Sequence, residues 1–199
     1  MTKGRLEAFT DGVLAILITI MVLELRAPEG SSLSALRPLV PTLLTYMLSF
    51  VMLAIYWNNH HHLMQVVEHI DGLVLWANMF LLFWLSLVPF TTAWMGEHPR
   101  EPAPVATYGV VLLGAAIAYF LLTRALLNLH EPGSRLAVAL GRDWKGKLSA
   151  VAYAVAIPLA LVWTWLSIAV YVGVAIVWLV PDRRMARVSN EPTTGSREL

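Results

Sequence analysis

The sequence predicts an all-α integral membrane protein with six transmembrane helices per subunit, on three observations. Of its 199 residues, 58% are hydrophobic and only 14% are charged, whereas soluble domains are about 45–50% apolar and about 25% charged. Several apolar runs reach the roughly 18 residues that mark a membrane span. Short polar segments rich in Pro, Gly and charge separate these runs. A very apolar soluble bundle is the alternative, and the length of the runs disfavours it.

The six predicted spans follow from these runs. The first run is closed by the Pro/Gly/Ser segment at 27–38, the second carries Pro41 in its first turn, where a missing N–H costs little, and the third ends at GEHPREPAP. The polar segment 128–147 after the fourth run holds one short surface helix. The expected spans are residues 8–25, 39–60, 72–95, 105–127, 148–163 and 166–180. They form one domain over residues 1–184, followed by a polar, disordered cytoplasmic tail at 185–199.

The last two spans come from one uncharged stretch, residues 149–180. A single helix of that length would measure about 48 Å at 1.5 Å per residue, against a hydrocarbon core of about 30 Å. We therefore predict two short spans with a turn near Trp163–Ser167, and Pro158 as a possible kink site in the first. One tilted helix with an interfacial tail is the alternative.

The distribution of Lys and Arg predicts that both termini are cytoplasmic and that the protein lies in the cell membrane. With six spans both termini share a side, and positive charge favours the cytoplasmic side. The terminal side carries 11 Lys and Arg residues and the other side three. The 11 are Lys3, Arg5, Arg124, Arg135, Arg142, Lys145, Lys147, Arg183, Arg184, Arg187 and Arg197, and the three are Arg26, Arg37 and Arg100.

Several classes of function are disfavoured by what the sequence lacks. The formal net charge of +1 argues against nucleic acid as a partner. The absence of cysteine excludes disulfides, thiolate catalysis and Cys-ligated metals. No HExxH, GxSxG or P-loop signature occurs. We therefore expect neither an enzyme nor a cofactor.

The first span carries ionisable residues at both ends and one helical stripe between them. Gly12, Ile16, Thr19, Ile20 and Leu23 follow Asp11 at the spacing of a single helix face. Arg5, Glu7 and Asp11 precede the apolar run, and Glu24 lies near its far end. Ionisable residues beside a span tend to face a protein interior or a water path. The helix dipole accounts equally well for Glu7, whereas Asp11 lies deeper and predicts a buried partner.

The candidate partner for Asp11 lies in the sequence YWNNHHHLM, which closes the second span on the same side. Histidine can donate to a carboxylate and titrates near neutral pH. Neighbouring residues on a helix point about 100° apart, so His60, His61 and His62 cannot form a metal site by themselves. A polar cluster that links spans 1 and 2, contacts to lipid headgroups, and metal binding remain as alternatives. Asn78 in the third span is expected to hydrogen-bond within the bundle.

Three motifs resemble those of the transmembrane protein 175 family, the endolysosomal potassium channels and their bacterial relatives. The family's R-x-x-x-F-S-D motif reads Arg5-Leu6-Glu7-Ala8-Phe9-Thr10-Asp11 here, with threonine in place of serine. Its W-x-x-H-H pattern is matched by Trp57, His60 and His61, and the PDRR at 181–184 also looks like the family. Animal members carry two six-span repeats. One repeat resembles the bacterial branch, whose members form homotetramers.

The resemblance implies a role for each residue of the first span. In the family the first helix of each subunit lines a central pore. The constriction would then be formed by Ile16, with Ile20 and Leu23 as further apolar rings and Thr19 as the layer tied to potassium preference. Glu24 would lie at the outer mouth. The network that anchors the helix would comprise Arg5, Phe9, Thr10, Asp11, Trp57 and either His60 or His61.

The expected function is a homotetrameric, potassium-preferring cation channel in contact with membrane lipid. Threonine hydroxyls replace a hydration shell less completely than a filter of backbone carbonyls, and no T-V-G-Y-G filter is present, so the expected preference for potassium over sodium is modest. Asp11 and the histidine run motivate a proton-conducting or pH-sensing channel as one alternative. A non-conducting membrane sensor or structural protein is another.

Overall fold

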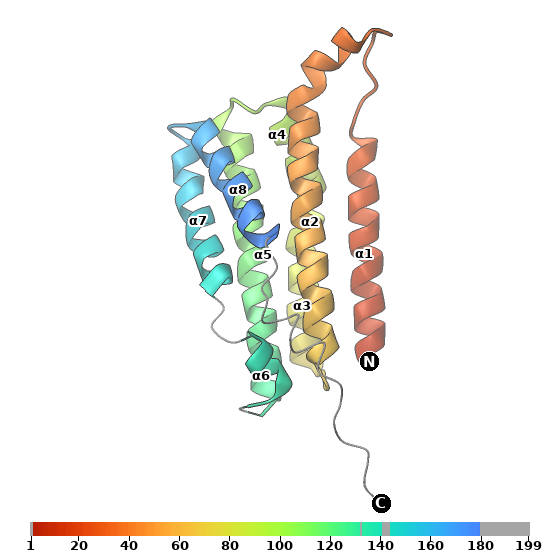
Figure 1. The fold of residues 1–199 in the computed structure, drawn as a ribbon, viewed down its shortest axis with the longest axis vertical. Coiled ribbons are helices and arrows are strands. Elements are labelled where there is room, and N and C mark those ends of the chain that lie inside the picture. Colours follow the sequence, from red (N-terminus) through yellow and green to blue (C-terminus); the bar gives the residue numbers. More distant parts are fainter. Residues whose placement is uncertain (1, 132, 141–143, 180–199) are drawn as a thin grey trace, which may run out of the picture.

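The computed structural model describes residues 2–131, 133–140 and 144–179, and the regular elements in these parts are helices joined by short connections. Figure 1 shows the long helices side by side along one axis, with the N-terminus of α1 and the short helix α6 at the same end. The elements are α1 (Lys3–Leu23), the 3₁₀ helix η1 (Leu33–Leu39), α2 (Val40–Val66), α3 (Gly72–Ser86), α4 (Val88–Glu97), α5 (Pro102–Leu129), α6 (Arg135–Leu140), α7 (Trp144–Ala160) and α8 (Thr164–Leu179).

Four helical segments of the described chain are long and apolar enough to cross a membrane. They are Lys3–Leu23, Leu33–Val66, Gly72–Glu97 and Pro102–Leu129, and Thr164–Leu179 is a shorter apolar helix. These lengths and compositions make the chain an all-helical membrane protein. The helices extend past the apolar runs at several ends. α1 begins at Lys3 rather than residue 8, and α2 continues to Val66 rather than residue 60, because polar residues at a membrane surface continue a helix as readily as apolar ones.

Two local features differ from the expected pattern. The segment 27–38, expected as a loop, contains part of η1. The expected third span is interrupted at Leu87, which separates α3 from α4. Pro89 explains the second difference, because it has no N–H to donate to Leu85, four residues earlier. The N–H of Leu87 bonds to the carbonyls of Leu85 and Trp84, and α4 begins at the next residue, Val88.

The C-terminal helices are joined by a short turn. α7 ends at Ala160 and α8 begins at Thr164, so the turn lies just before the expected position at Trp163–Ser167. Pro158 lies inside the last turn of α7. The PDRR sequence at 181–184 and the tail at 185–199 lie outside the described residues.

The core of the bundle is built around α5, which packs against α3, α4, α7 and α8. Two glycines of α5 permit the close contacts. A Cβ at Gly114 would collide with the indole ring of Trp84, and one at Gly109 would collide with the hydroxyl of Tyr171. By contrast, α1 lies at one edge of the bundle, opposite α7 and α8 (Figure 1), and it contacts α2, α3 and α4. This position buries one side of α1 and leaves the other side uncovered.

Candidate functional site

The uncovered side of α1 carries the residues that the sequence singles out. We call it the open face, and it comprises Phe9, Gly12, Ile16, Thr19, Ile20 and Leu23. Ile16 is 57% exposed and Leu23 is 78% exposed. Exposed apolar residues are ordinary in a membrane, because lipid covers them. The open face differs from a plain lipid-facing stripe in carrying a small residue, Gly12, and a polar one, Thr19.

The Thr19 hydroxyl is satisfied within its own helix. Its Oγ1 lies 3.0 Å from the carbonyl oxygen of Ala15 and 2.9 Å from that of Ile16, and it donates to them. Its hydrogen is thus directed back toward the helix. The lone pairs of the oxygen stay free on the open face as acceptors, which is the chemistry that a passing cation needs.

The opposite side of α1, which we call the buried face, comprises Leu6, Thr10, Leu14, Leu17 and Met21. Its apolar residues belong to one core cluster with residues of α2, α3 and α5. Because the two faces lie on opposite sides of one helix, the contacts of the buried face determine which residues the open face presents.

A fully buried chain of hydrogen bonds fixes α1 near its N-terminal end. The Asn78 amide Nδ2 of α3 donates to Thr10 Oγ1 at 2.9 Å, and the Asn78 Oδ1 accepts from Nε2 of His60 at 2.9 Å. The chain therefore joins α1, α2 and α3. Nδ1 of His60 is buried and has no partner among the described residues. Each bond inside an apolar environment is costly to break, because no water replaces it.

A second polar group lies nearer the surface at the same end. The Trp57 indole Nε1 donates to Asp11 Oδ1 at 2.9 Å. The His61 ring stacks on Trp57, and its Nδ1 lies 3.1 Å from Glu7 Oε1. Gln65 Nε2 lies 3.0 Å from the other ring nitrogen of His61. With a hydrogen on Nδ1, His61 donates to Glu7 and its other ring nitrogen accepts from Gln65. At this end of the bundle, two side-chain pairs therefore tie α1 to α2, namely Asp11 with Trp57 and Glu7 with His61.

The structure brings some of the expected network together and leaves other members apart. The partner of Asp11 is Trp57, rather than His60 or His61. His60 reaches α1 only through Asn78. Arg5 is exposed, and its side chain makes no ion pair or hydrogen bond with the described residues. Phe9 is exposed on the open face, and Glu24 is exposed at the other end of α1, directly after its last turn.

Two residues of the site were not expected in these roles. Asn78 was expected to hydrogen-bond within the bundle, but not as the link between Thr10 and His60. For Glu7 the helix dipole was an equally good explanation, and no partner was predicted, whereas Glu7 pairs with His61. The sequence does carry a signal for the role of Asn78. It is a lone amide inside an apolar span, and such groups usually hydrogen-bond to neighbouring helices. Within residues 2–131, 133–140 and 144–179, no group of three His, Asp or Glu residues could hold a metal ion.

Comparisons with known proteins connect this site to a family. The family model of the endosomal/lysosomal potassium channel TMEM175 matches residues 5–89, which include most of α1 and all of α2 and α3. A potassium channel from Chryseobacterium sp. (strain P1-3) is 48% identical over 191 residues, which are 96% of this chain and 100% of the relative.

A solved structure and an animal relative extend the comparison. The crystal structure of a lysosomal potassium-selective channel TMEM175 homologue from Chamaesiphon minutus superposes with a TM-score of 0.73 at 30% identity, covering 89% of this chain and 96% of that one. The endosomal/lysosomal proton channel TMEM175 of Danio rerio is 26% identical over 134 residues, 65% of this chain but only 25% of the relative.

Proposed function

The chain belongs to the TMEM175 family of ion channels, and we propose that it is a potassium channel in which four copies arrange their α1 helices around a central pore. The Chryseobacterium relative, which it matches from end to end, is named a potassium channel. The Chamaesiphon homologue, which shares its fold, is described as potassium-selective. The observation that carries the proposal for the pore is the open face of α1, a continuous stripe that no other helix of the described chain covers.

In the proposed pore, apolar side chains close the path. Rings of Ile16, Ile20 and Leu23 would form a hydrophobic constriction, which can stop ion flow by expelling water. Such rings cannot coordinate a bare ion, so conduction requires α1 to rotate or move outward. The Thr19 hydroxyls lie between the rings and offer oxygen acceptors, which supports a modest preference for potassium over sodium.

The charged residues at the two ends of α1 would have different roles. Glu24 follows the last turn of α1 and is exposed, so four copies would raise the local cation concentration at the outer mouth. Arg5 is exposed at the other end and has no partner within the described chain. We propose that it pairs across the interface between subunits, where a neighbouring carboxylate could reach it.

The same proposal places the chain in the membrane. Six helical segments would cross it: α1, α2 with η1, α3 with α4, α5, α7 and α8. Both termini would face the cytoplasm of a bacterial cell, with residues 185–199 as a cytoplasmic tail. α1 and α7, whose first turns carry Lys3, Lys145 and Lys147, both begin toward the same end of the bundle (Figure 1), in keeping with positive charge on the cytoplasmic side.

The constriction is tested by current measurements on purified protein in planar bilayers, with its mass in lipid discs giving the number of subunits. Ile16→Ala should raise potassium current about tenfold or more, because a wider and less apolar ring stays wet. Ile176→Ala is the matched control, since Ile176 is 58% exposed on α8, on the opposite side of the bundle. No cation current from an intact tetramer, or equal currents from both variants, contradicts the proposal.

Selectivity is tested by reversal potentials in mixed potassium and sodium. Thr19→Val keeps the shape but removes the oxygen, so the ratio of potassium to sodium permeability should fall toward one. Thr19→Ser keeps the hydroxyl and should retain the preference. An unchanged ratio in Thr19→Val would remove this residue from the selectivity mechanism.

A second candidate function is proton conduction, favoured by the contact between His61 and Glu7 near the N-terminal end of α1 and by the similarity to a proton channel over 65% of the chain. Proton uptake into vesicles under a pH gradient would support it if His61→Gln slows the uptake. A flux and gating that stay constant from pH 5 to pH 8 would rule it out. A protein that does not conduct at all would show no change of permeability in Ile16→Asn.

A further inference from the structure

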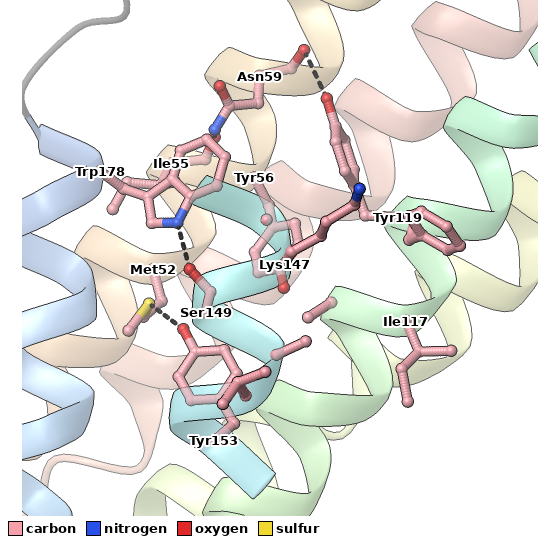
Figure 2. A pocket seen from close by; sticks show the side chains of 15 residues that line it. Met52, Ile55, Tyr56, Asn59, Ile117, Tyr119, Lys147, Ser149, Tyr153 and Trp178 are labelled. Atoms are coloured by element: carbon pink, nitrogen blue, oxygen red, sulfur yellow. Dashed lines mark hydrogen bonds between the residues drawn. The ribbon is translucent and has the colours of Figure 1, made fainter. Parts of the chain in front are cut away.

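A cavity of about 330 Å³ lies among α2, α5, α7 and the end of α8, on the side of the bundle away from α1. Figure 2 shows it from close by. Ligand cavities usually measure about 300–1,000 Å³, so this one is large enough for part of a small ligand. Met52, Ile55, Tyr153 and Trp178 are among its lining residues.

The walls of the cavity offer little to a polar ligand. Several of its polar groups are paired: the Trp178 indole N–H donates to Ser149 Oγ at 2.8 Å, and the Tyr119 hydroxyl donates to the carbonyl of Asn59 at 3.2 Å. The Tyr153 hydroxyl contacts the sulfur of Met52 at 3.8 Å. With these groups paired, the surface that remains is mostly apolar, and it suits a hydrocarbon chain.

One end of the cavity is cationic. Lys147 lines it from the first turn of α7 and is exposed, and its side chain makes no hydrogen bond or ion pair with the described residues. The Lys145 ammonium lies near the same end, 5.8 Å from the centre of the Trp178 ring. Basic pockets between helices at a membrane surface are typical sites for anionic lipid headgroups.

The cavity also opens toward the side of the bundle. Its rim includes Ile117 of α5 and Val151 of α7, which are 45% and 59% exposed. Apolar residues on this outer surface of a membrane protein face lipid tails. A chain from the surrounding bilayer can therefore enter between α5 and α7 without crossing water.

We propose that this cavity binds one acyl chain of an anionic phospholipid, whose phosphate group is held by Lys147. The apolar walls account for the chain, the unpaired ammonium accounts for the charge, and the lateral opening gives the route of entry. The site lies away from the open face of α1, and the proposal does not rest on ion conduction.

The test uses full-length protein in vesicles of phosphatidylglycerol or phosphatidylcholine, followed by native mass spectrometry to count retained lipids. Ala150→Trp fills the cavity and should abolish retention, and Ala116→Phe fills it from α5 if the first variant does not fold. Ala154→Trp is the matched control, because Ala154 lies one turn further along α7, is exposed and does not line the cavity. Equal retention in the filled and control variants overturns the proposal.

The role of Lys147 has its own measurement. Lys147→Gln should lower the preference for phosphatidylglycerol over phosphatidylcholine about fivefold, as expected for one basic group at a membrane surface. Arg37→Gln removes a charge at the other end of the bundle and should leave the preference unchanged. An unaltered preference in Lys147→Gln overturns the headgroup contact.

The rim is tested separately, because a second copy of the chain could cover it instead of lipid. The sequence contains no cysteine, so Val151→Cys introduces a single thiol. Efficient disulfide formation between chains in the membrane would show that the rim is an interface between copies, and this would overturn the proposal. Accessibility to a lipid-soluble thiol reagent supports it.

Discussion

The two faces of α1 have nearly the same kinds of residue and very different surroundings. Each face has several large apolar side chains and one threonine. The buried face, with Leu14 and Thr10, packs into the core and joins the hydrogen-bond chain through Asn78. The open face, with Ile16 and Thr19, is exposed and makes no side-chain hydrogen bond to another helix among the described residues. Residue type alone therefore does not distinguish a positioning face from a proposed pore face.

Substitution of an apolar residue should produce the largest difference in stability between the two faces. Leu14→Ala should lower the free energy of unfolding by about 3 kcal/mol, because it leaves a cavity in the core. Ile16→Ala should change the stability of the single subunit by less than about 0.5 kcal/mol. Chemical denaturation in detergent, followed by circular dichroism, measures both values. Equal losses would mean that the open face is covered within the subunit.

Two glycines extend the comparison to close contacts. Gly114→Ala should destabilise the bundle by about 2 kcal/mol, because the new methyl group meets the Trp84 ring. Gly12→Ala on the open face meets no atom and should raise the stability of the subunit, by up to about 1 kcal/mol, through better helix propensity. Thermal melting of both variants in the same detergent measures the difference. A loss in Gly12→Ala, confined to the oligomer, would show that another copy packs there.

The threonine pair gives the cleanest comparison, because the same substitution is made on both faces. Thr10→Val removes the acceptor of Asn78 Nδ2 and should cost about 1–2 kcal/mol of stability. Thr19→Val should leave stability unchanged within about 0.5 kcal/mol, since its hydroxyl bonds only its own helix. Denaturation curves of the two variants, recorded under the same conditions, measure both changes in the free energy of unfolding. Equal costs would contradict the assignment of the faces.

The smallest change in stability is expected for the pair of Glu7 and His61, which belongs to neither face. Glu7→Gln should lower stability by less than about 1 kcal/mol, because Glu7 and His61 are both partly exposed. The difference should shrink in about 1 M salt, where exposed charges are screened beyond about 3 Å. A large loss that persists in high salt would mean that the pair is buried by a neighbouring copy.

Much of the fold and of the stripe on α1 follows from the sequence. Hydropathy locates the long apolar helices, because an apolar run of membrane length has few alternatives. The helical spacing from Gly12 to Leu23 groups the residues that share the open face, since they lie on one side of any helix that forms. The interruption at Leu87 was missed, although Pro89 is visible in the sequence, because a proline in the first turn of a helix and one inside a span look alike.

The polar partners were harder to predict than the faces. The histidine run offers three rings within one turn, and the choice among them depends on the rotation of α2 relative to α1. That rotation comes from packing over the whole bundle, which no local pattern encodes. Hence Asp11 pairs with Trp57, His61 with Glu7, and His60 with Asn78. The motif contains both Arg5 and Asp11, and it does not reveal that the Arg5 side chain lacks a partner among the described residues of the subunit.

The lengths of the described parts of α7 and α8 have a consequence for the membrane itself. These parts have 17 and 16 residues and measure about 26 and 24 Å, less than the roughly 30 Å of a typical hydrocarbon core. In the proposed six-span arrangement, lipids beside this pair must compress to match it, at a cost of fractions of a kcal/mol per Å. Hydrophobic mismatch would then make this edge of the protein sensitive to acyl-chain length, so that shorter-chain lipids gather around it.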